Sequence, residues 1–336
     1  MANSYCYDHA GPLTWTVEDA AISLQALAGY DPLDPASSSA DIPDYRQALE
    51  GNLKGLRVGV IRHFHETDMP ASGEAIAAFE AGLSVLEGLG AHLSDVRMRT
   101  PADYQHIKVV VAESELLSIH GPVLQSRLGD FGEDFLGRVL PACLFNGADY
   151  VNAQRARREA IAEMAPIYAD CDVLVCMGPG PAPLIDSWRT VEFWKKGSLT
   201  VPFNVTSGPA LVQCTGYTSS GLPLSWQIAG KPFSDAKVMQ VAHAYETNTD
   251  WRSQRPNLTA GTPALALPAV PNVDAGDCPA ALADECAVAL RRAGLTVTEK
   301  QFAMVCAAAP YVQDIRARLS TSRQWPQEPA NIFVSR

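Results

Sequence analysis

Two histidines and a glutamate near residue 63 have a spacing that could bind a metal ion. His63, His65 and Glu66 lie in the stretch HFHE, directly after an apolar run. If that run is a β-strand, alternate residues at its end point to the same side, so the two imidazoles could share one ion. No third ligand can be assigned from the spacing, so we predict that the chain has no metal site and needs no cofactor.

A serine and a lysine could instead perform nucleophilic chemistry, because a serine hydroxyl becomes reactive when a base takes its proton. The segment TSSG at residues 218–221 contains neighbouring serines, and it falls between two strand-like runs. We therefore interpret it as a turn rather than as a nucleophile loop.

The elements that must position such residues follow an α/β pattern. LRVGVIR at 56–62 predicts a strand, residues 72–89 a helix, and HLSDVRM at 92–98 a second strand, which together indicate a βαβ unit with parallel strands. Residues 101–169 are mostly helical in pattern, and CDVLVCM at 171–177 predicts a strand that is covered on both faces. Two more strands flank the 218–221 turn, and a helix is expected from about residue 235.

Composition and charge exclude several classes of protein. The 336 residues are 47% hydrophobic and carry a net charge of −11, which argues against a nucleic-acid groove or an anionic membrane surface as the main partner. Of the eight cysteines, Cys171 and Cys176 are the closest pair, and they bracket an apolar run that is typical of buried thiols. No segment has the pattern of a signal peptide or a membrane span, so we predict a reduced, cytoplasmic protein.

Four segments resemble the amidase signature family in order and spacing. They are YDHAGPLTWTVEDAA at 7–21, DCDVLVCMGPGPAP at 170–183, TVPFNVTSGPALVQCTGY at 200–217 and GLPLSWQIAGKPFSDAKVMQVAHAYETNTDW at 221–251. The resemblance covers residues 3–256 and implies hydrolysis or transfer of amide carbon–nitrogen bonds. It also implies a mixed, largely parallel sheet flanked by helices.

The family's catalytic groups have no counterpart in this chain. The family uses a serine nucleophile, a second serine and a lysine base, which lie before the segment that matches DHAGPL. No Gly-Gly-Ser-Ser-Gly-Gly segment occurs, and the lysines match none of the family's catalytic contexts; these lysines are Lys54, Lys108, Lys195 and Lys196. We therefore assign no catalytic residue and expect a C-terminal portion, truncated at its N-terminus, that is inactive alone.

Three residues match positions at the family's substrate pocket. Arg138, in FGEDFLGRV, aligns with a basic position that holds a substrate carboxylate in the glutamine-using amidotransferases of the family. Phe203 and Asn204, in PFN, lie where the family turns beneath the site. Gly197 stands where those amidotransferases have an acid, which counts against glutamine as the substrate. His9 is interpreted as a hydrogen-bonding partner in the turn, and His243 as packed against the sheet.

A second resemblance concerns the C-terminal residues. VTEKQFAMVCAAAPYVQDIRARL at 297–319, followed by EPANIF, is similar to the small helical partner subunit of carboxybiuret-hydrolase-type amidases. We therefore predict an amidase-signature domain over 1–257, a Pro/Ala-rich linker over 258–275 and a small helical domain over 276–336.

Two functions remain open. The chain is either the C-terminal portion of a serine amidohydrolase for a small amide or ureido substrate, or a non-catalytic subunit that binds another amidase chain. A homo-oligomer is also compatible with the sequence, because an incomplete sheet would expose an edge.

Overall fold

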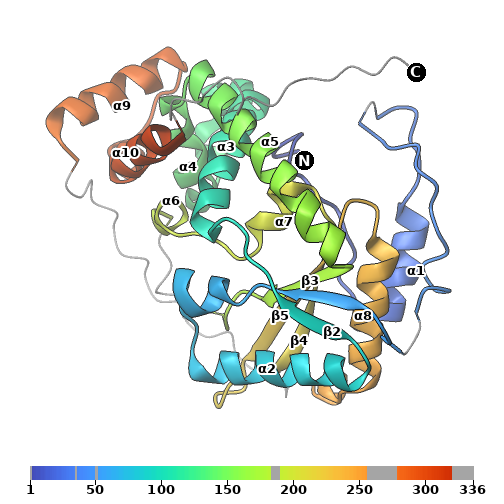
Figure 1. Cartoon of the computed structure of the whole chain (residues 1–336). Coiled ribbons are helices and arrows are strands. Elements are labelled where there is room, and N and C mark those ends of the chain that lie inside the picture. Colours follow the sequence, from blue (N-terminus) through green and yellow to red (C-terminus); the bar gives the residue numbers. More distant parts are fainter. Residues whose placement is uncertain (1, 35, 50–51, 183–189, 256–277, 320–336) are drawn as a thin grey trace, which may run out of the picture.

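The computed structural model describes residues 2–34, 36–49, 52–182, 190–255 and 278–319. Within these residues a five-stranded mixed sheet lies between two layers of helices, and a further group of helices packs beside one layer (Figure 1). The strand order is β2-β1-β3-β5-β4, with β1 at Arg57–Val60, β2 at His92–Asp95, β3 at Val173–Met177, β4 at Ala210–Tyr217 and β5 at Pro223–Ala229. This confirms the predicted α/β fold.

The strand pairing combines parallel and antiparallel neighbours. β1 is parallel to both β2 and β3, whereas β5 is antiparallel to both β3 and β4. The predicted βαβ unit is therefore confirmed, with α2 (Gly73–Gly88) as its helix. All five residues of β3 are buried, as expected for a central strand with helices on both faces.

Each face of the sheet has its own apolar core. On one face α2 and α8 (Asp235–Thr247) pack on the strands, with α1 (Val17–Leu27) against α8, and the core includes Phe79, Trp226 and Tyr245. The other face is covered by α3 (Pro101–Arg127), α5 (Gly147–Asp170) and α7 (Val201–Thr206), whose core includes Leu174.

A third apolar core joins the C-terminal helices to α3 and α4. The C-terminal helices are α9 (Ala280–Arg292) and α10 (Glu299–Leu319). Helix α4 spans Glu133–Val139, and α6 (Glu192–Lys195) contacts α10. In Figure 1 the red α10 lies beside α3, α4 and α5 rather than on the sheet. The described residues of the predicted C-terminal helical region form the helices α9 and α10, whereas the 258–275 linker and the EPANIF segment lie outside the described residues.

The residues after β1 differ from the sequence expectation. β1 ends at Val60, and Phe64–Asp68 form a single π-helical turn. His63 and His65 therefore do not alternate along a strand end, and the geometric premise of a shared metal ion is wrong. By contrast, residues 218–221 form the expected turn, in which Gly221 adopts a φ of 83° and the Gly221 N–H donates to Thr218 O. No helix among the described residues is long and apolar enough to cross a membrane.

Candidate functional site

A cluster of three charged side chains lies where α3 meets α4. Glu113 Oε1 accepts hydrogen bonds from Lys108 Nζ at 2.9 Å and from Arg138 Nη2 at 3.0 Å. The Glu113 side chain is 0% exposed, that of Lys108 15% and that of Arg138 33%. A wholly buried carboxylate therefore holds two cations, each of which keeps a route to solvent.

An aromatic ring from α6 completes the cluster. Lys108 Nζ lies 4.7 Å from the centroid of the Phe193 ring, and the Arg138 guanidinium carbon lies 4.6 Å from it. Two hydrogen bonds position α6: Trp194 Nε1 donates to Gly137 O and Gln105 Nε2 donates to Phe193 O, both at 3.0 Å. Helix α6 is thus anchored to α4 and α3, and the cations gain favourable contact with the ring.

The electrostatics of the cluster favour an anion. Burial lowers the pKa of Lys108 below its ordinary value of 10.5, although the nearby Glu113 carboxylate opposes that change. Glu113 Oε2 and Arg138 Nε are buried and have no hydrogen-bond partner among the described residues. With two cations and one carboxylate, the cluster is suited to receive a further negative group.

The other two predicted substrate contacts lie on α7, and neither takes part in the hydrogen bonds that Glu113 accepts. Phe203 is buried in the core between the sheet, α3 and α5, and Asn204 is half-buried beside it. The helix ends at Ser207, whose φ of 61° is left-handed, and Arg157 holds this end by donating to Val205 O and Ser207 Oγ. Phe203 is thus part of the apolar core.

His9 and His65 differ in their hydrogen bonding. His9 Nδ1 lies 2.8 Å from Tyr7 O, in agreement with a structural role in the turn. Both ring nitrogens of His65 are buried without a hydrogen-bond partner among the described residues, and burial lowers its pKa. Within those residues no group of three or more His, Cys, Asp or Glu side chains could hold a metal ion.

Two of the candidate lysines and one serine of the 218–221 turn have other partners. Lys195 and Lys196 pair with Glu192 at 3.2 and 2.8 Å, while Ser220 shares a hydrogen bond with Thr218 in the β4–β5 turn. The described residues include no hydrogen bond between a lysine and either serine of that turn.

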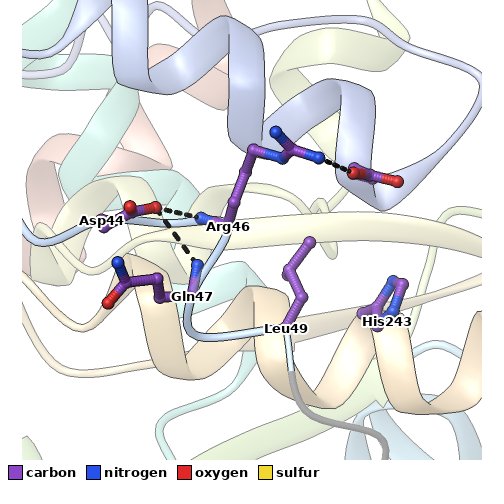
Figure 2. A pocket seen from close by; sticks show the side chains of 6 residues that line it. Asp44, Arg46, Gln47, Leu49 and His243 are labelled. Atoms are coloured by element: carbon purple, nitrogen blue, oxygen red, sulfur yellow. Dashed lines mark hydrogen bonds and ion pairs between the residues drawn. The ribbon is translucent and has the colours of Figure 1, made fainter.

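A surface pocket lies elsewhere, between α8 and the segment that follows α1 (Figure 2). Its volume is about 430 Å³, and its lining residues are Glu18, Asp44, Arg46, Gln47, Leu49 and His243. Arg46 is already paired with Glu18, and Asp44 accepts backbone N–H groups of Arg46 and Gln47. His243, expected against the sheet, instead lines this pocket. The polar groups mostly satisfy one another, so we do not regard it as the chemical site.

Sequence reasoning identified Arg138 but missed Lys108, Glu113 and Phe193 as its neighbours. A signal was present: Lys108 and Glu113 interrupt the apolar stretch IKVVVAE at 107–113. Charged residues in such a stretch are rarely buried unless they are paired. The pairing with Arg138, 25 residues further along the chain, follows only from the packing of α4 on α3.

Comparisons with known proteins match this architecture. A glutamyl-tRNA(Gln) amidotransferase subunit of Synechococcus sp. (strain JA-2-3B'a(2-13)) is 33% identical over 282 residues, which are 75% of this chain and 54% of that protein. The corresponding subunit of Lysinibacillus sphaericus (strain C3-41) is 32% identical over 284 residues, or 76% and 57% of the two chains. The chain thus spans about half the length of these curated relatives.

Solved structures agree in fold. One, described as an unexpected vestigial protein complex that reveals the evolutionary origins of an s-triazine catabolic enzyme, matches with a TM-score of 0.64 and 25% identity over 74% of this chain and 55% of that one. The corresponding glutamyl-tRNA(Gln) amidotransferase subunit of Thermotoga maritima matches with a TM-score of 0.62 and 23% identity, over 74% and 55%. A family model described as Amidase matches residues 2–239. The chain belongs to the amidase family.

Proposed function

We propose that this chain is the C-terminal portion of an amidase-signature hydrolase. In this proposal it contributes to cleavage of an amide carbon–nitrogen bond once the family's Ser-Ser-Lys region completes it, and the residues of this chain are inactive alone. The observation that carries the proposal is the family match over residues 2–239 in a sequence with no Gly-Gly-Ser-Ser-Gly-Gly segment. A serine amidase without its nucleophile and base cannot form the acyl intermediate.

The substrate side of the proposal uses the cluster around Arg138. Arg138 would bind a carboxylate of a small amide or ureido acid, because a guanidinium offers several N–H donors to a flat anion. Asn204 would contribute a polar group at the pocket, and Phe203 would support it from the core. The protein would act in the cytoplasm on a free small molecule.

The test is ammonia release from a panel of simple amides and ureido acids. The purified full chain is assayed alone and then with the protein encoded by the adjacent upstream gene. We expect no release from the chain alone and release from the mixture. Turnover by the chain alone would refute the assignment and require an unrecognised nucleophile.

A non-catalytic role is the second candidate, favoured by the edge of the sheet. Among the described residues β4 pairs only with β5, and Val212 on this strand is 54% exposed. Such an edge can accept a strand from another chain. Stable complex formation with another amidase chain, without ammonia release from the complex, would support this role instead.

A further inference from the structure

Lys108 lies in the cluster with Arg138, yet the function proposed above gives it no role. Its Nζ atom and the Arg138 Nη2 atom both donate to Glu113 Oε1, at 2.9 and 3.0 Å. Both cations also lie over the ring of Phe193. The ammonium and the guanidinium therefore converge on one carboxylate oxygen and one aromatic ring, so that they lie side by side.

Charge within the cluster is not balanced by Glu113 alone. Lys108 and Arg138 carry two positive charges against one negative charge, at partly buried positions. Asp8 also attracts Lys108, but its carboxylate already accepts the backbone N–H groups of Asn3 and Ser4, at 2.7 and 3.1 Å. A second anion close to both cations would reduce the cost of burying them.

A ligand from solvent can reach Lys108 and Arg138 but not the carboxylate of Glu113. Glu113 is wholly buried, whereas Lys108 and Arg138 are each partly exposed. Glu113 takes one N–H from each cation, and an ammonium has three N–H donors and a guanidinium five. The remaining donors can therefore serve a ligand while Glu113 keeps both side chains in place.

We propose that Lys108 is a second cationic contact for the substrate carboxylate, and that Glu113 is the positioning residue that aligns Lys108 with Arg138. The proposal rests on the proposed function in taking Arg138 as the contact for that carboxylate. The ligand class is a small acid that carries an amide or ureido group.

The test is isothermal titration calorimetry of the full chain with succinamate and succinamide, which are similar in size but differ in charge. We expect the wild-type chain to bind succinamate at least about 10-fold more tightly, since charge-assisted hydrogen bonds are the stronger ones. Lys108→Met should reduce this preference about 10-fold and leave the affinity for succinamide unchanged, and Lys108→Arg should restore most of it. Lys54→Met, at an exposed site, is the matched control.

Glu113 is tested by the same ratio of affinities. Glu113→Gln should lower the preference for succinamate, and it should add little when Lys108→Met is already present, because both changes disrupt one arrangement. If Glu113 only supported the fold, its substitution would lower the affinities for succinamate and succinamide equally. Circular dichroism and thermal melting verify that each variant is folded.

Two outcomes would overturn the inference. One is a wild-type chain that binds succinamate no better than succinamide, and the other is Lys108→Met that keeps the wild-type preference. Because no hydrolysis is measured, these results are independent of the ammonia assay. If the completed enzyme releases ammonia but the Lys108→Met variant keeps the wild-type preference for succinamate, only the role of Lys108 is refuted. Preserved discrimination without hydrolysis would refute only the proposed function.

Discussion

Replacing Glu113 by Gln should destabilise the fold more than any comparable surface change. The substitution keeps the shape of the side chain and removes its charge, so Lys108 and Arg138 lose the carboxylate that compensates them. Removing one partner of a buried ion pair commonly costs about 3–5 kcal/mol, mainly because the remaining charge stays buried.

The exposure of the two cations puts this cost at the lower end of that range. Arg138 is one-third exposed and can turn its guanidinium toward water, whereas Lys108 is 15% exposed and is more confined. We therefore expect a loss of about 3 kcal/mol in the free energy of unfolding. Glu113→Gln combined with Lys108→Met should recover part of it, because the double variant buries one cation fewer.

Urea denaturation followed by tryptophan fluorescence measures these differences. Asp314→Asn is the matched control, because its ion pair with Arg318, at 2.8 Å, is largely exposed and should contribute about 0.5 kcal/mol or less. A Glu113→Gln variant whose loss equals that of the control would refute the reasoning, since it would mean that the cluster is well solvated.

Three further predictions concern stability and association. Burial holds His65 neutral in the folded state and lowers its pKa from the ordinary 6.5. The stability that neutral His65 contributes is therefore present above pH 6.5 and is lost as the pH falls through the lowered pKa of the folded state. In a His65→Leu variant the free energy of unfolding should fall less between about pH 7.5 and about pH 5.5 than it does in the wild type. Gly137→Ala should cost about 1–3 kcal/mol in urea denaturation, because its Cβ would collide with Thr190 and Met304, whereas Gly121→Ala, with open space in α3, should be neutral or stabilising. The isolated chain should self-associate through the β4 edge, so Val212→Lys should shift its elution in size-exclusion chromatography toward the monomer, and an unchanged profile would count against that edge.

The sheet was accessible to sequence reasoning because its signals are local. An apolar run such as VLVCM and the strand–helix–strand spacing at 56–98 specify strands and a parallel crossover with little help from the rest of the chain. The turn at 218–221 was equally predictable, because Gly221 supplies the positive φ that such a turn requires. The π-helical turn after β1 could not be predicted, because a continuing strand and a tight turn show the same pattern of apolar and polar residues over three positions.

The charged cluster was harder to predict because its contacts are non-local. Helix α3 (Pro101–Arg127) is long and contains polar residues on most of its faces. Nothing in the local sequence indicates which of these polar residues another helix will cover. Lys108 and Glu113 are five residues apart on α3, and Arg138 reaches them only because α4 folds back over α3. The aromatic ring comes from α6, at residue 193, and no local pattern connects that residue with the charged ones.

The cost of this cluster is itself an argument for a ligand. Well-packed apolar residues often stabilise a core as well as a buried ion pair does, so stability alone gives little reason to bury Lys108, Glu113 and Arg138 together. Neighbouring positions show that the chain can fill this layer with apolar side chains, as Val109, Val110 and Val111 do. The two cations that Glu113 holds stay partly exposed, and this arrangement is therefore better explained by binding than by folding. The succinamate titration separates these explanations, because a folding role predicts no dependence on the charge of the ligand.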